Sequence, residues 1–249
     1  MVPSPNPVAF EDDLYAVKAF APNDVWAAGW YWNGLGTSPG YALVIHWNGV
    51  EWSQLAAPTP GTFLTRIYAM SGTSDSDIWT AGVYQLVSNG TPYAFASHWN
   101  GSSWTSYTLP TGPGFVSAGE IRGLFALPSA SGVSTDVWAV GNTPGYLDGL
   151  CDHWDGTNWT NYPCGGSLAP FYSVSAVASN FVWAVGGQGS PAIAWWDGYR
   201  WNMASTSQVH AAILYGVNAL NSSSAHAVGY NYNYSINTAE TTAEMYSVP

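Results

Sequence analysis

Four acidic residues stand just before two segments that we expect to be inner strands, where they are the best candidates for acid–base chemistry: Glu11, Asp12, Asp13 and Glu120. Glycoside hydrolysis needs two carboxyl groups about 5 to 10 Å apart, one as acid and one as base or nucleophile. Asp12 or Asp13 with Glu120 could form such a pair, but the other expected inner strands have no carboxylate at this position. We name no catalytic residue, and a glycoside hydrolase ranks third among the functions considered.

Three of the four basic residues, Lys18, Arg66 and Arg122, fall inside expected inner strands. Together with Glu120 they would line a channel with charges of both signs. Such a channel could bind an ion, water or a polar ligand, because concentrated charge is a signal of a site. The alternative is that these charges only satisfy one another.

Aromatic and amide side chains gather in segments that we expect to be loops on one face. Saccharides bind through aromatic faces under their C–H groups and through polar partners for their hydroxyls, so this composition fits a carbohydrate surface. The alternative is that these side chains pack the loops against one another. The candidate ligand-binding residues are Trp30, Trp32, Asn33, Tyr41, Tyr84, Tyr93, Tyr146 and Tyr232.

Three histidines, His46, His98 and His153, recur at equivalent places. Metal ligands must converge to about 2 Å from one ion, and equivalent positions of separate repeats would lie far apart. We therefore interpret the histidines as structural and expect no metal site and no cofactor. The repeated Asp24, Asp77 and Asp136 are interpreted in the same way, as turn formers.

The two cysteines, Cys151 and Cys164, flank one expected hairpin. Their Cα atoms could then approach within the roughly 7 Å that a disulfide allows, and we expect a disulfide. Two buried free thiols are the alternative. A disulfide, scarce lysine and several Asn-x-Ser/Thr sequons favour an extracellular or cell-surface location.

The charge balance excludes several kinds of partner. The 249 residues carry a formal net charge of −11, with 4 basic residues against 15 acidic ones. Binding a phosphate backbone requires clustered cations, so we expect no nucleic acid partner. No apolar run reaches the roughly 18 residues of a membrane span, so we expect no membrane insertion.

Tryptophan-containing segments recur at intervals of roughly 40 to 60 residues, which is typical of propellers and solenoids. Each of four copies is followed by a Trp-Asn/Asp-Gly-x-x-Trp segment, and a fifth, degenerate copy has His226 where the others have Trp. The five copies are Val25–Gly29, Ile78–Gly82, Val137–Gly141, Val182–Gly186 and Ala225–Gly229. The twelve repeated tryptophans are best explained by packing, whereas Trp30, Trp32 and Trp195 lie outside the pattern.

Each repeat reads as four short strands. Runs of β-branched and aromatic residues bounded by Gly, Pro, Asn or Ser are strand signals. Asn48-Gly49 and its equivalents predict two-residue type I′ hairpins between the third and fourth strands. A four-stranded antiparallel meander per repeat predicts propeller blades.

We therefore predict an all-β, single-domain, five-bladed β-propeller of four-stranded antiparallel blades over 1–249. The fifth repeat lacks a fourth strand, and we expect the amino-terminal strand, residues 1–6, to supply it and close the ring. Closure would remove exposed strand edges. The expected blades span residues 10–60, 61–113, 114–167, 168–208 and 209–249.

The pattern Asp-Val-Trp-Ala-Val-Gly followed by His-Trp-Asp-Gly-x-x-Trp, at residues 136–159, resembles the repeats of secreted bacterial propeller proteins. It also loosely resembles the Asp-box hairpin of sialidase-like propellers. In architecture the chain is similar to tachylectin-2-type lectins, a comparison that carries over no binding residue.

The function we expect is that of a non-catalytic, secreted or cell-surface module that binds a saccharide or glycoconjugate. The alternative is a structural or protein-interaction propeller, including a self-assembling surface component, since low charge and exposed aromatics suit subunit contacts.

Overall fold

The computed structural model describes residues 2–7, 10–34, 38–110, 118–146, 148–164, 169–204, 211–233 and 238–247. This part of the chain is built from β-strands, with one short 3₁₀ turn, η1 (Pro144–Tyr146). None of its helical segments is long and apolar enough to cross a membrane.

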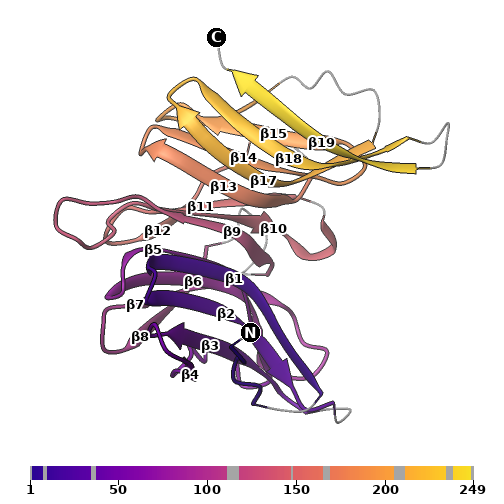
Figure 1. The fold of residues 1–249 in the computed structure, drawn as a ribbon. Helices are drawn as coiled ribbons and strands as arrows, with labels where there is room; N and C mark the ends of the chain where they lie inside the picture. The colour runs from indigo at the N-terminus through magenta and orange to yellow at the C-terminus, as the bar shows by residue number, and fades with distance from the viewer. Residues whose placement is uncertain are drawn as a thin grey trace.

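The strands form five antiparallel groups that follow one another along the chain, and we call them units 1 to 5 (Figure 1). Units 1 and 2 are joined into one sheet by a parallel contact between Gly40 and Leu64. Unit 1 contains β1 (Glu11–Ala21), β2 (Asp24–Trp32), β3 (Gly40–Trp47) and β4 (Trp52–Gln54), and unit 2 contains β5 (Leu64–Ser74), β6 (Asp77–Gln85), β7 (Tyr93–Trp99) and β8 (Trp104–Thr108). Unit 3 contains β9 (Glu120–Ala126), β10 (Val137–Asn142), β11 (Gly149–Trp154) and β12 (Trp159–Asn161), and unit 4 contains β13 (Phe171–Ala178), β14 (Phe181–Gly187), β15 (Pro191–Trp196) and β16 (Trp201–Met203). Unit 5 contains β17 (Ala211–Asn221), β18 (Ser224–Asn233) and β19 (Thr238–Ser247).

The turns between the third and fourth strands differ from the expected type I′ geometry. In unit 1, Trp47 pairs with Trp52, so four residues form the loop. Gly49 has a φ of 95°, but Asn48 is not among the positive-φ residues. The Asn48 side chain instead accepts hydrogen bonds from the amides of Val50 and Glu51 at 2.9 and 3.0 Å. An Asx turn closed by this side chain therefore replaces the second left-handed residue.

Neighbouring units pack through the repeated tryptophans. Trp79 of unit 2 is fully buried and contacts Trp154 and Trp159 of unit 3, with ring centroids 5.5 and 5.6 Å apart. Trp138 of unit 3 contacts Trp196 of unit 4 in the same way, at 5.1 Å. Each large aromatic buries roughly 150 to 250 Å², so these rings hold the units together.

The first strands of the units contact one another in the order β1, β5, β9, β13 and β17, and β1 and β17 do not share an extensive contact. Figure 1 shows units 1 and 5 at opposite ends of this series, with unit 3 between them. Apolar side chains remain open at both ends. Val17 of β1 is 68% exposed and Val228 of β18 is 52% exposed, whereas Val140 and Val185, which correspond to Val228 in units 3 and 4, are fully buried.

The amino-terminal strand expected over residues 1–6 is not observed. Residues 2–7 lie outside any strand, and unit 5 has three strands in the described part of the chain. Pro3, Pro5 and Pro7 have no backbone N–H, so this segment lacks several of the donors that hydrogen bonding to a neighbouring strand requires.

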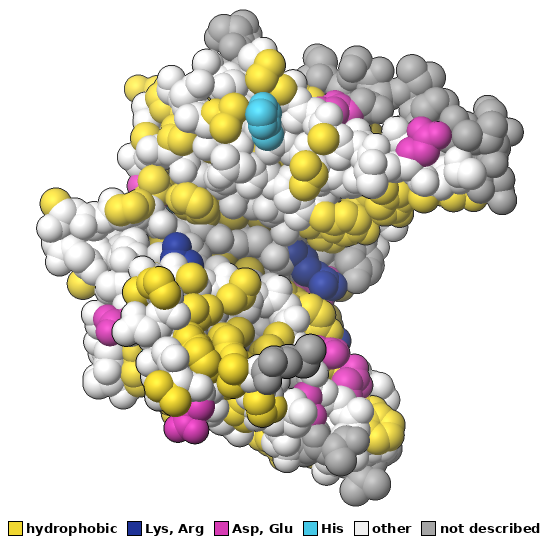
Figure 2. Space-filling model, in the orientation of Figure 1, with side chains coloured by type: hydrophobic (Ala, Val, Ile, Leu, Met, Phe, Trp, Pro, Cys, Tyr) yellow, Lys and Arg dark blue, Asp and Glu magenta, His cyan; other side chains and the backbone are white. Residues whose placement is uncertain are grey.

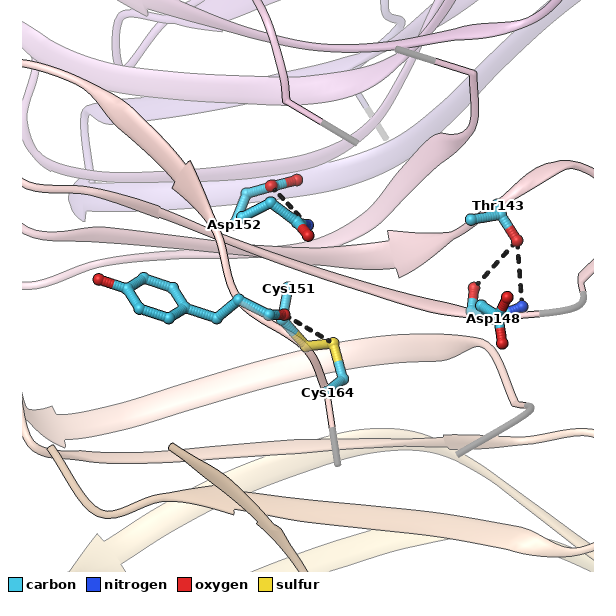
Figure 3. The surroundings of a disulfide bond; sticks show 7 residues. Thr143, Asp148, Cys151, Asp152 and Cys164 are labelled. Atoms are coloured by element: carbon cyan, nitrogen blue, oxygen red, sulfur yellow. Dashed lines mark hydrogen bonds between the residues drawn. A yellow bond between two sulfur atoms is a disulfide. The ribbon is translucent and has the colours of Figure 1, made fainter. Parts of the chain in front are cut away.

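Cys151 and Cys164 are joined by a disulfide between β11 and the segment after β12, with Cα atoms 5.9 Å apart (Figure 3). Both cysteines are buried in the apolar cluster that joins units 3 and 4. The disulfide therefore fixes the end of unit 3 against the core of its neighbour.

Candidate functional site

One side chain from each of the five units, four tyrosines and one arginine, lines a hollow of about 370 Å³, which we call the axial hollow. Each residue comes from the first strand of its unit. The lining residues are Tyr15, Tyr68, Arg122, Tyr172 and Tyr215. This volume lies within the roughly 300 to 1,000 Å³ typical of ligand sites.

The tyrosines are arranged in two pairs with Arg122 between them. Tyr15 and Tyr68 meet at 5.3 Å with an interplanar angle of 69°, and Tyr172 and Tyr215 meet at 5.3 Å with an angle of 32°. The guanidinium carbon of Arg122 lies 4.0 Å from the centroid of the Tyr68 ring. The hollow therefore combines aromatic faces with one cationic group.

Glu120 and Arg122 form an ion pair beside the hollow. Arg122 donates from Nη2 and Nε to Oε1 of Glu120 at 2.6 and 2.9 Å. The side chains of Arg122 and Glu120 are both largely shielded from solvent, at 26% and 16% exposed. Two charge-assisted hydrogen bonds to one carboxylate oxygen hold the pair in a fixed geometry. The charged residues of the inner strands thus include one close pair of opposite sign.

Arg66 lies on the other side of Tyr68 and links the hollow to the end of β2. Its Nη1 donates to the Tyr68 hydroxyl at 3.3 Å, and its guanidinium lies 3.5 Å from the centroid of the Trp30 ring. Trp30 in turn donates from Nε1 to Asp13 at 3.2 Å, and the Tyr15 hydroxyl donates to the same carboxylate oxygen. These contacts fix the orientation of the tyrosine pair.

The two tyrosines at the ends of the series are the accessible ones. Tyr15 is 48% exposed and Tyr215 is 55% exposed. Burial, followed by the nearby Asp13 carboxylate, raises the pKa of Tyr15, and burial followed by Tyr230 raises the pKa of Tyr215. Both hydroxyls therefore stay protonated at neutral pH and can donate hydrogen bonds.

The two tryptophans expected to form a binding surface, Trp30 and Trp32, do not present open ring faces. Trp30 is only 6% exposed, and Arg66 covers its ring. Trp32 is half-buried, meets Phe10 edge-on at 5.2 Å and donates from Nε1 to the backbone oxygen of Ser38. Trp30 therefore offers no free face to a ligand. Its ring contacts Arg66 and its N–H binds Asp13 instead.

The loop tyrosines form stacked pairs across neighbouring strands. Tyr41 stacks on Tyr31 at 5.3 Å, and Tyr84 stacks on Tyr93 at 5.2 Å. Tyr41 remains 46% exposed, whereas Tyr84 is buried. Each pair occupies directly opposed positions of its strands, so pairing within a sheet explains both.

The remaining candidates are distributed over separate elements. Asn33 is exposed just after β2, and Tyr232 is half-buried on β18. Lys18 is half-buried on β1, with Nζ 5.6 Å from the Phe20 ring. The side chain of Tyr146 lies outside the described residues.

The tyrosines of the axial hollow were not among the candidates that the sequence suggested, which lie mainly in the expected loops. Tyr15, Arg122, Tyr172 and Tyr215 each directly follow the first apolar residue of the inner-strand motif, Leu14, Ile121, Phe171 and Leu214. Because these four residues occupy the same position of the repeat, the sequence could have predicted that they lie next to one another. Tyr68 comes from a different position of β5 and could be placed only by the fold.

The repeated histidines are paired with the repeated aspartates. Nε2 of His46, His98 and His153 lies 2.9, 2.7 and 2.9 Å from Oδ1 of Asp24, Asp77 and Asp136 respectively. The aspartates therefore bind histidine side chains of the next strand, which corrects their interpretation as turn formers. The described residues contain no cluster of three or more His, Cys, Asp or Glu side chains suited to a metal ion.

No protein-family model matches the chain, and no curated protein matches it. Solved structures do match. A protein of unknown function from Dyadobacter fermentans matches over 98% of this chain and 78% of its own, with a TM-score of 0.62 and 12% identity. The six-bladed β-propeller lectin of Aleuria aurantia, which recognises fucose, matches over 92% of this chain and 73% of its own, with a TM-score of 0.57 and 14% identity. Virginiamycin B lyase from Staphylococcus aureus matches over 95% and 70%, with a TM-score of 0.56 and 12% identity. At such low identity these likenesses show the fold alone, which is that of a β-propeller.

Proposed function

We propose that this protein is a non-catalytic carbohydrate-binding propeller and that a saccharide lies in the axial hollow. The observation that carries the proposal is the convergence of four tyrosines and Arg122, one from each unit, on a single hollow. The fucose-recognising lectin among the structural neighbours is consistent with a binding role for this fold.

The chemistry of the hollow suits a sugar ring. Tyrosine faces can pack against the apolar C–H face of a pyranose, and protonated tyrosine hydroxyls can donate to its oxygens. Arg122 and Glu120 supply a donor and an acceptor held in place by their ion pair. Aromatic faces and directional polar groups together would select a polyhydroxylated ligand over a purely apolar one.

A glycan array followed by isothermal titration calorimetry tests the proposal. We expect at least one saccharide to bind, and Tyr15→Ala and Tyr215→Ala to weaken binding at least tenfold. Tyr199→Ala is the matched control, because Tyr199 is 89% exposed in the hairpin between β15 and β16. Unchanged binding by both hollow variants would exclude the hollow, and the release of sugar products would indicate an enzyme instead.

We further propose that the five units form a five-bladed ring in solution. In support, β1 and β17 both contribute to the same hollow, and the apolar Val17 and Val228 at the two ends would gain from being covered. An extracellular or cell-surface location is part of the same proposal, supported by the disulfide, since disulfides persist in oxidising environments.

The second candidate function is self-association through the ends of the series. Met245 of β19 and Val17 of β1 are each 68% exposed, and exposed apolar patches often mark protein interfaces. Size-exclusion chromatography with light scattering distinguishes the candidates. A stable oligomer that Met245→Asp dissociates would favour self-association, whereas a monomer at all concentrations would favour ring closure within one chain.

A further inference from the structure

A second hollow, of about 570 Å³, lies between units 1 and 2, and we call it the notch. Asp24, Trp26 and His46 line it from unit 1, Trp99 lines it from unit 2, and Leu55, just after β4, lies at its wall. It is formed by different residues from those of the axial hollow.

The carboxylate of Asp24 is only half-satisfied by the protein. Its Oδ1 accepts a hydrogen bond from Nε1 of Trp26 at 3.1 Å and lies 2.9 Å from Nε2 of His46. Its Oδ2 has no hydrogen-bond partner among the described residues, and the side chain is 23% exposed. One carboxylate oxygen is therefore available to a ligand in the notch.

The equivalent carboxylate in unit 2 shows which groups can fill such a place. Asp77 also binds its histidine, His98, through Oδ1. Its Oδ2, however, accepts from the hydroxyl of Thr73 at 2.5 Å, from the backbone N–H of Ser134 at 3.0 Å and from the hydroxyl of Ser134. Two hydroxyl groups and one amide of the protein thus satisfy this oxygen in unit 2.

Unit 1 lacks both hydroxyl donors. The strand register aligns Phe20 with Thr73, because Ala21 pairs with Asp24 as Ser74 pairs with Asp77. The segment that carries Ser134 connects β9 to β10, and its counterpart next to unit 1 is the short turn between β5 and β6. That turn places Asp75 in the lining of the notch, but among the described residues none of its groups donates a hydrogen bond to Asp24 as Ser134 does to Asp77.

A third difference leaves space beside the carboxylate. Leu55 follows Trp52 by the same interval as Tyr107 follows Trp104. Tyr107 stacks on Trp79 at 5.8 Å, and the corresponding Tyr162 packs near Trp138 at 6.2 Å. Leu55 packs against the cluster that buries Trp26, but it is smaller than tyrosine and has no ring or hydroxyl beside Asp24.

From this comparison we propose that the notch is a second saccharide site, in which two hydroxyls of a sugar ring bind Asp24 as the hydroxyls of Thr73 and Ser134 bind Asp77. The half-buried ring of Trp99 offers apolar surface to the C–H groups of the sugar, and the buried Trp26, with its ring centroid 6.1 Å away, supports that ring from behind. This deepens the proposed carbohydrate function by a site that does not depend on the axial hollow.

The test uses the full chain carrying Tyr15→Ala and Tyr215→Ala, so that binding in the axial hollow does not interfere. Methyl glycosides of fucose, mannose, galactose and glucose are titrated while the indole N–H signals are followed by NMR. We expect one of them to shift the signals of Trp26 and Trp99. If these two substitutions abolish binding in the axial hollow but a glycoside still shifts the notch tryptophan signals, the two sites are independent.

Two further substitutions, each made in that same background, identify the notch. Leu55→Tyr should fill it as Tyr107 and Tyr162 fill their places, and should weaken binding at least tenfold with thermal unfolding preserved. Asp24→Asn should weaken binding to a similar extent, whereas Asp136→Asn, which alters the same Asp–His pair in unit 3, should not. The proposal is overturned if no glycoside shifts these signals up to about 100 mM, or if both notch variants bind as tightly as their parent.

Discussion

Ser134 donates both its backbone N–H and its hydroxyl to the carboxylate of Asp77, which lies fully buried in the neighbouring unit. This carboxylate also binds His98 and Thr73. The loop between β9 and β10 is thereby tied to unit 2 through one side chain. Of the three repeated Asp–His pairs, only the Asp77–His98 pair also binds the neighbouring unit through hydrogen bonds among the described residues. We call this contact the Asp77 junction.

Asp77→Asn should destabilise the protein more than Asp24→Asn does. Hydrogen bonds to charged groups contribute about 1.5 to 3 kcal/mol each, and Asp77 accepts several of them without access to water. We expect losses of about 3 kcal/mol for Asp77→Asn and about 1 kcal/mol for Asp24→Asn, measured by urea unfolding. Equal losses would contradict a special role for the Asp77 junction.

Acid should weaken the same junction. Burial is the largest single influence on the pKa of Asp77 and raises it, but hydrogen bonds from His98, Ser134 and Thr73 together outweigh burial and lower the pKa. A lowered folded-state pKa stabilises the protein above the unfolded pKa of about 3.9. We therefore expect stability to fall as the pH drops through the folded-state pKa, and to fall less in Asp77→Asn, as followed by unfolding at pH 2 to 6.

Asp152 should have the opposite pH dependence. Burial raises its pKa well above the usual value, and the hydrogen bond from Asn161 lowers it only in part. Its Oδ2 has no partner among the described residues (Figure 3 shows the surroundings). Stability should therefore decrease as the pH rises through the folded-state pKa. Urea unfolding of Asp152→Asn between pH 5 and 9 should lack this decrease, while Asp155→Asn, a change at an exposed turn, should retain it.

Val17→Asp tests whether the two ends of the series meet. If Val17 is covered in a closed ring, an unpaired charge there should cost about 2 kcal/mol or more, whereas a substitution at an exposed position changes stability by about 0.5 kcal/mol or less. Closure within one chain predicts a large loss that does not depend on protein concentration. In the view of Figure 2, hydrophobic side chains lie on the surface of both halves of the molecule.

The matched control is Val50→Asp, since Val50 is 79% exposed at a hairpin tip. It should leave the unfolding midpoint almost unchanged. A small effect for both variants would contradict closure, and a loss for Val17→Asp that disappears on dilution would indicate self-association.

Replacing both cysteines should lower stability by about 3 kcal/mol, the chain-entropy value for a loop of roughly 15 residues. Cys151 and Cys164 are separated by 13 residues in sequence. The double Cys151→Ala/Cys164→Ala variant should show this loss in urea unfolding, and dithiothreitol should produce a comparable loss in the natural chain. An unchanged midpoint under reducing conditions would contradict a stabilising disulfide.

The sequence alone predicted the repeating β-structure because its signals are local. Strand patterns, Asn-Gly and Asp-Gly turns and recurring tryptophans depend on residues within one repeat, and the burial of Trp79, Trp138 and Trp183 confirms that these rings form the scaffold. The propeller fold follows from stacking such units. The amino-terminal strand was predicted wrongly, because a resemblance between short proline-containing segments does not determine which edge they meet.

The candidate sites depended on contacts between repeats, which no local pattern specifies. The sequence placed Arg122 and Glu120 in the inner strands, but only the fold brings Tyr15 and Tyr215 from opposite ends of the series to one hollow. It also covers Trp30 with Arg66. The tertiary structure decides which aromatic rings stay accessible, because accessibility depends on what the neighbouring unit places against each ring.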